Sequence, residues 1–170
     1  MDASSLTLFS GGCWFCPGSA FLLRQESFHL VGLQDQSMRR LEDLDWFIRF
    51  GLLGGQYKST DTFDVVIQLS GEAPYDSVMA ACGQLVDKFG PSGPNALPRP
   101  AWNRLAAYVA LEKAVAHIDA NEFLKGGLEL AKTLSRKPRF RPALEDFWIE
   151  HHEIPADVQK AYETLVTTPT

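Results

Sequence analysis

The sequence has few cysteines, and this scarcity limits the kinds of protein it can encode. Three of its 170 residues are cysteine (Cys13, Cys16 and Cys82), too few for a disulfide-stapled scaffold. No apolar run approaches the length of a membrane span, and the first five residues lack the basic region of a secretory signal. We therefore expect a cytoplasmic protein with no membrane partner, in which paired thiols serve redox chemistry or metal binding.

Basic residues are also fewer than acidic ones. There are 16 basic and 21 acidic residues, giving a formal net charge of −5, which argues against a nucleic-acid partner. Residues 136–141 form one local basic cluster. We find no phosphate-cradling glycine loop, nucleotide fingerprint or hydrolase triad, so the sequence names no cofactor. What remains is an ordinary globular composition, 45% hydrophobic and 22% charged, in a chain long enough for a buried core.

A Cys-x-x-Cys pair near the N-terminus is the feature that suggests chemistry. Residues 6–9 (Leu-Thr-Leu-Phe) predict a short buried strand, Ser-Gly-Gly turns the chain, and Cys13 and Cys16 follow. Pro17 suits the first position of a helix that continues through residues 20–24. This spacing is typical of dithiol sites, in which one sulfur forms a mixed disulfide and the other attacks it.

The remaining apolar patterns divide the chain into two parts. Further strands are predicted at residues 28–33, 63–69 and 72–75, with helices at residues 38–50 and 76–89. Beyond a linker rich in glycine and proline at residues 90–100, helices are predicted at residues 101–119 and 122–134, after Pro142, and from Pro155 to about residue 165. The predicted fold is therefore a β-α-β-α-β-β-α domain of the α/β class, residues 1–92, followed by an all-helical C-terminal subdomain, residues 93–170.

Several of these segments resemble the DCC thiol-disulfide oxidoreductase family. The strand, the run Gly-Gly-Cys-Trp-Phe-Cys and the later Phe-Leu-Leu-Arg are similar to that family's strand, Asp-Gly-x-Cys-x-x-Cys motif and helix. Residues 28–34, which end in Leu-Gln, resemble its second strand, and residues 63–71 resemble its third strand and turn. The resemblance covers about the first 90 residues and implies a thioredoxin-like fold.

The same resemblance implies thiol-disulfide exchange as the activity. Cys13 would attack a disulfide of a protein or small-thiol substrate, and Cys16 would resolve the mixed disulfide. Trp14, Phe15 and Pro17 would form the apolar surface on which the substrate docks. This chemistry requires a thiol reductant, but it requires no bound cofactor and no metal.

Two departures from the family pattern favour an alternative function. Ser10 stands where the family has aspartate, and no proline precedes Phe63, where thioredoxin-like proteins carry one. The alternative is a non-catalytic protein–protein interaction module whose helical subdomain binds the partner. Candidate contacts there are Trp102, Phe147 and Trp148, since exposed aromatic residues are frequent at interfaces.

A metal site is a third hypothesis. Cys13 and Cys16 supply two thiolates, and two further ligands would come from Cys82, His29, His117, His151 and His152. Structural zinc usually takes two short-spaced pairs of ligands, and the sequence has one such cysteine pair. His151 and His152 are adjacent, so on one helix they point roughly 100° apart and cannot easily face the same ion. The apolar neighbours of Cys82 instead predict a buried thiol.

Overall fold

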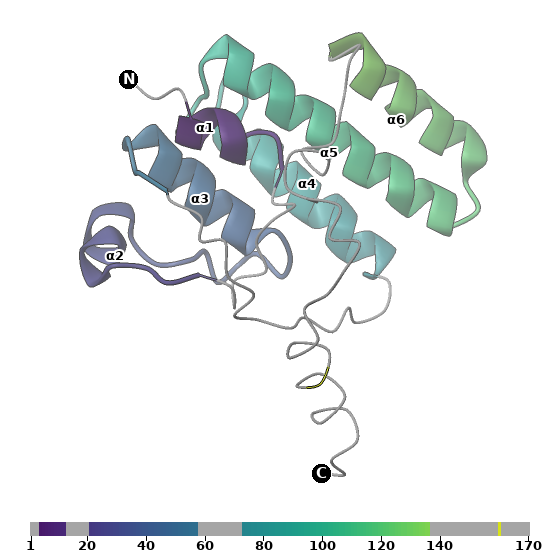
Figure 1. Cartoon of the computed structure of the whole chain (residues 1–170). Coiled ribbons are helices and arrows are strands. Elements are labelled where there is room, and N and C mark those ends of the chain that lie inside the picture. Colours follow the sequence, from purple (N-terminus) through teal and green to yellow (C-terminus); the bar gives the residue numbers. More distant parts are fainter. Residues whose placement is uncertain (1–3, 13–20, 58–72, 137–159, 161–170) are drawn as a thin grey trace.

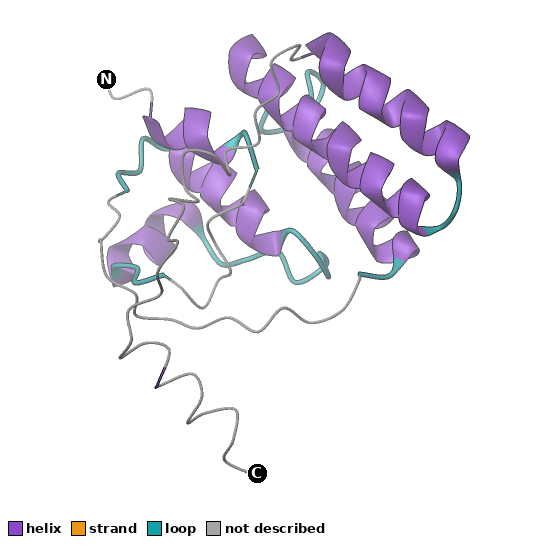
Figure 2. Cartoon of the chain, turned by 45° about the vertical axis from the view of Figure 1, so that its right-hand side comes forward, coloured by secondary structure: helices purple, strands orange, loops and turns teal. Residues whose placement is uncertain are grey.

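The structure is a computed structural model that describes residues 4–12, 21–57, 73–136 and 160. Within those ranges the chain forms helices joined by loops and contains no strand (Figure 2). The helices are α1 (Ser4–Phe9), α2 (Gln25–Val31), α3 (Glu42–Leu52), α4 (Tyr75–Phe89), α5 (Arg99–Asp119) and α6 (Phe123–Arg136). The predicted thioredoxin-like α/β fold is therefore wrong, because segments assigned to its sheet are helical.

The hydrophobic core lies among α1, α3, α4 and α5. Helices α3 and α4 carry apolar residues at three- and four-residue spacing, which gathers these residues on one side of each helix, toward the core. Fully buried core side chains include Phe9, Leu44, Ile48, Leu85, Phe89 and Leu105. Helix α6 packs on α5 at the outside of this group, at the opposite end from α2 and α3 (Figure 1).

Four helices predicted from periodicity are confirmed as α3 to α6, with shifted ends. The largest shift is at α3, which begins at Glu42 rather than at residue 38. The preceding residues form a turn in which the Ser37 amide donates to Asp35 Oδ1 at 2.8 Å. Leu41, immediately before α3, has a φ of 59°, and this left-handed conformation keeps the helix from extending further back.

The strand predicted at residues 6–9 is helix α1. A short apolar run fits either a buried strand or one side of a buried helix, and its period cannot separate the two. The helix places Phe9 in the core and brings Leu6 close to α3, since a Cβ on Gly51 would lie 2.9 Å from Leu6 Cα. Gly51, one residue beyond the helix predicted at residues 38–50, lies inside α3, and its lack of a side chain lets α1 approach closely.

The strand predicted at residues 28–33 is helix α2 followed by a loop. Gly32, with a φ of 83°, ends this helix, and its amide donates to Phe28 O at 2.9 Å. Two neighbouring predictions are also wrong. Residues 21–24, expected to be helical, lie outside any helix, and Tyr75, expected in an edge strand, is the first residue of α4.

Other predictions fall outside the described residues or stay untested. The strand at residues 63–69 and the helix after Pro142 belong to the first group, as does the helix from Pro155 to about residue 165 apart from residue 160, which is helical. Residues 90–98 join α4 to α5, and the predicted division after residue 92 falls in that loop. The division into two domains stays a prediction.

Candidate functional site

The predicted dithiol site lies outside the described residues; it consists of Cys13, Trp14, Phe15, Cys16 and Pro17. The described residues on its two sides both contact α3. Phe9, before the site, stacks on Phe47 with ring centroids 4.9 Å apart. Phe21, after the site, lies 4.3 Å from the same ring. The residues before and after the Cys-x-x-Cys stretch therefore both pack on Phe47. The roles predicted for the residues of that stretch stay predictions.

Cys82 is a buried thiol, as the sequence predicts. It is fully buried on α4, and its Sγ donates to Val109 O of α5 at 3.8 Å. Burial, and to a lesser extent the charge of Glu112, raises the pKa of Cys82 to about 12. Because thiolates are the reactive and metal-binding form, Cys82 is suited to neither role at neutral pH.

The described histidines do not assemble a metal site with Cys82. Across the described ranges, no three His, Cys, Asp or Glu side chains are grouped so that they could hold a metal ion. His29, which falls in the strand predicted at residues 28–33, is exposed on α2. His117 is buried on α5 and pairs with Glu122 Oε2 at 2.7 Å through its Nδ1. His117 therefore serves a contact within the α5–α6 turn rather than a metal site.

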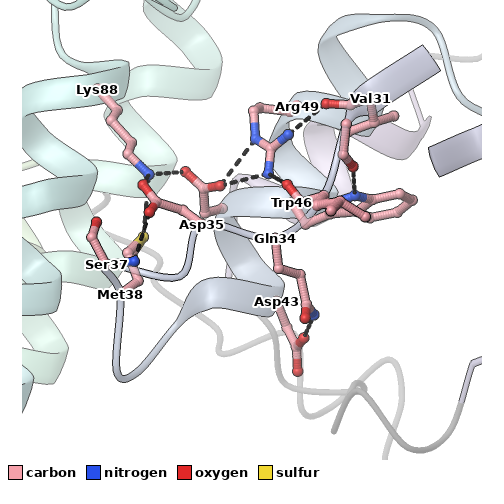
Figure 3. Close-up of polar contacts among 12 residues, drawn as sticks. Val31, Gln34, Asp35, Ser37, Met38, Asp43, Trp46, Arg49 and Lys88 are labelled. Atoms are coloured by element: carbon pink, nitrogen blue, oxygen red, sulfur yellow. Dashed lines mark hydrogen bonds and ion pairs between the residues drawn. The ribbon is translucent and has the colours of Figure 1, made fainter. Parts of the chain in front are cut away.

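A buried carboxylate organises the junction between α3, α4 and the loop after α2 (Figure 3). Asp45 of α3 is fully buried. Lys88 Nζ of α4 donates to Asp45 Oδ1 at 2.8 Å, and Arg49 Nε donates to Oδ2 at 3.0 Å. Lys88 also donates to Asp35 Oδ2 at 2.6 Å. This ion-pair network ties residues 32–38 to both helices.

The network changes the pKa values of Asp35 and Lys88, its two half-buried members. The hydrogen bond from Lys88, followed by those from Ser37, holds the pKa of Asp35 well below its usual range. Burial by itself lowers the pKa of Lys88, but its hydrogen bonds to Asp35 and Asp45 outweigh that effect and raise it. The ions therefore stabilise one another, which indicates a structural role for this network.

Side chains of α3 also satisfy the end of α2. Arg49 donates to Val31 O at 2.6 Å and to Leu33 O at 3.0 Å, and Trp46 Nε1 donates to Gly32 O at 2.7 Å. The last carbonyls of a helix have no partner within the helix. Arg49 and Trp46 supply these partners, so α2 is fixed to α3 although it buries none of its own residues.

Helix α6 packs on α5 through small residues. Its buried residues are Gly126 and Thr133. A Cβ on Gly126 would lie 2.8 Å from Ile118 Cγ1 and 3.2 Å from Ala114 O, so glycine allows the close approach. Thr133 Oγ1 donates to Ala107 O at 3.2 Å. The large apolar side chains of α6 consequently point elsewhere.

We use the name α6 face for the exposed apolar residues of the α5–α6 pair; these are Val115, Ile118, Phe123, Leu124, Leu128, Leu130 and Leu134. Leu124 is 88% exposed, and Phe123 and Leu128 are each 65% exposed. Groups of large apolar side chains that stay exposed to solvent mark candidate sites of interaction. The α6 face is therefore the candidate functional site of the described chain.

A hydrogen-bonded group fixes the start of α6. Glu122, in the turn between α5 and α6, pairs with His117 Nδ1, and Lys125 Nζ lies 2.6 Å from its Oε1. Tyr75 of α4 places its hydroxyl 3.3 Å from the same His117 nitrogen. Lys125, and after it His117, lower the pKa of Glu122. Three helices thus hold the α5–α6 turn, and the α6 face sits on a fixed support.

Of the three aromatic residues that the sequence suggested as contacts for a partner, the structure describes one. Trp102 of α5 is half-buried and packs against the hydrophobic core, which leaves it a structural role. Phe147 and Trp148 lie outside the described residues. Sequence reasoning missed the α6 face, although the spacing of Leu124, Leu128 and Leu134 was the available signal.

Comparisons with known proteins identify no relative: no family model, no curated protein and no solved structure matches this chain. In the part of the chain that the structure describes, no helix has the length and apolar character needed to cross a membrane. The function must therefore be argued from the α6 face itself.

Proposed function

We propose that this chain is a protein–protein interaction module that binds its partner on the α6 face. The observation that carries the proposal is the reversed packing of α6, which buries Gly126 and Thr133 and exposes Leu124 and Leu128. Fully burying one leucine side chain is worth about 1.5–3 kcal/mol. A partner that covers both Leu124 and Leu128 therefore gains about 3–6 kcal/mol from these two side chains, which offsets part of the cost of association.

The rest of the described structure supports a scaffold role. The Asp45 network fixes α2 to α3 and α4, and the Glu122 group fixes the start of α6. A binding surface held on rigid helices loses little conformational freedom when a partner docks. Thiol-disulfide exchange by Cys13 and Cys16 stays a separate prediction, since both residues lie outside the described residues.

The test is a selection of displayed helical peptides on the immobilised full-length chain. Dissociation constants of the selected peptides are then measured on wild type, on Leu124→Glu/Leu128→Glu and on the control Leu30→Glu/Leu33→Glu. The control residues are also exposed leucines, but they lie on or just after α2.

We expect the first variant to weaken binding at least about tenfold, because it places charges in the apolar contact. The control variant should bind as wild type does. The proposal fails if no peptide is selected, or if the selected peptides bind the Leu124→Glu/Leu128→Glu variant as tightly as wild type.

A further inference from the structure

The charges beside the α6 face indicate the chemistry of its partner. Lys125 and Lys132 are seven residues apart, about two helical turns, and therefore lie on the same side of α6. Leu128 lies three residues after Lys125 and four before Lys132, so it neighbours both on the helix surface. Arg136 continues this row by one more turn. We call Lys125, Lys132 and Arg136 the basic row.

The basic row is more exposed than the carboxylates that pair with it. The side chains of Lys125 and Lys132 are 61% and 55% exposed, whereas those of their partners Glu122 and Glu129 are 36% and 16% exposed. The acidic groups thus lie toward the body of the protein, and Glu122 is also held by the buried His117. A molecule that approaches the α6 face meets ammonium groups before carboxylates.

This charge arrangement disfavours two other occupants. A second copy that paired its α6 antiparallel to this one would bring the two basic rows together, and like charges in contact are repulsive. An anionic membrane surface would attract the basic row but would repel a chain whose formal net charge is −5. A partner protein that presents carboxylates beside apolar residues meets neither penalty.

We propose that the α6 face binds an acidic amphipathic helix of a partner protein, whose apolar stripe covers Leu124 and Leu128 while its carboxylates pair with the basic row. This inference rests on the proposed function and specifies its partner. The face extends from Phe123 to Leu134, roughly 16 Å at 1.5 Å per residue, so about three turns of a partner helix cover it.

The experiment uses the full-length chain and two synthetic helical peptides of about 20 residues, a length at which isolated helices form. Both have leucines at the same positions, but one carries glutamates and the other lysines at the remaining exposed positions. Binding is measured by fluorescence anisotropy at low and at high salt. We expect the glutamate peptide to bind about tenfold more tightly, since two or three exposed ion pairs at about 0.5 kcal/mol each give this ratio. The preference should shrink as salt rises.

Charge variants assign the preference to the basic row. Lys125→Gln/Lys132→Gln should remove it, and Lys125→Glu/Lys132→Glu should reverse it in favour of the lysine peptide. The control Arg39→Glu/Arg99→Glu changes net charge as much at exposed positions outside α6 and should keep the wild-type order. Circular dichroism checks that each variant keeps its helix content.

The outcomes separate this inference from the proposed function. Equal binding of both peptides, with loss on Leu124→Glu/Leu128→Glu, overturns the acidic partner but keeps the docking face. A wild-type dimer in sedimentation that this variant dissociates identifies a second copy as the occupant and overturns the inference. Binding to phosphatidylserine–phosphatidylcholine vesicles that this variant abolishes identifies a membrane and overturns both.

Discussion

Replacing Lys88 with methionine tests whether the buried Asp45 network stabilises the protein. Methionine keeps much of the aliphatic stem but removes the ammonium that lies 2.8 Å from Asp45 Oδ1. Removing one partner of a buried ion pair costs about 3–5 kcal/mol when the other charge is left alone. Here Arg49 still donates to Asp45, so the loss should be closer to that of one charge-assisted hydrogen bond, about 2 kcal/mol.

Urea unfolding followed by tryptophan fluorescence measures this loss, since the buried Trp46 lies on the same helix as Asp45. With a slope of roughly 2 kcal/mol per molar urea, the midpoint should fall by about 1 M. Lys132→Met is the matched control, because it breaks an exposed pair with Glu129 on α6. Such pairs contribute about 0.5 kcal/mol or less, so its midpoint should stay close to that of wild type.

The pH dependence gives an independent check. Lys88 lowers the pKa of Asp35 below its unfolded value of about 3.9. Asp35 therefore stabilises the fold above that pH, and the contribution is lost as pH falls through its lower folded pKa. Lys88→Met removes the main cause of the shift, so the difference between wild type and variant should narrow below about pH 4. Equal midpoints at pH 7 together with equal acid sensitivity would refute a stabilising role for Lys88.

Two further predictions concern α6 and the cysteines. Gly126→Ala should destabilise the chain by at least about 1 kcal/mol, because its Cβ would press on α5. Gly127→Ala should stabilise the chain by about 0.5–1 kcal/mol, because nothing lies within 4 Å of its Cβ. Thermal unfolding measures both changes, and equal effects of the two variants would contradict the packing of α6. In a glutathione redox series read by mass after alkylation, native Cys82 should stay unmodified because it is buried and protonated. Thiol-disulfide exchange predicts reversible loss of the Cys13 and Cys16 thiols in that series, with a midpoint at roughly −270 to −120 mV; thiols that stay reduced throughout would exclude it.

The periodicity of the sequence was sufficient to predict helices α3 to α6. Each combines apolar residues at three- and four-residue spacing with a clear boundary, such as Gly90 after α4 or Pro98 before α5. The burial of Cys82 also followed from its apolar neighbours. These properties are local, because they depend on residues within one or two helical turns.

The conformation of short apolar segments depended on the tertiary structure. The segments that became α1 and α2 have too few residues for their period to separate strand from helix. Contacts with α3 decided the outcome: Gly51 admits α1, and Arg49 satisfies the carbonyls that end α2. The resemblance to the DCC family was carried partly by these ambiguous segments, and the thioredoxin-like fold that it implied is wrong because they are helical.

The buried charge of Asp45 and the orientation of α6 were likewise decided by packing. Asp45 lies next to Leu44 in α3, and its burial is compensated by Lys88, which approaches from α4, together with Arg49 of the same helix. An amphipathic helix normally turns its large apolar side chains to the core, but α6 turns Gly126 and Thr133 inward. The sequence by itself determined that α6 is an amphipathic helix; the close contact available on α5 decided that its apolar side faces outward.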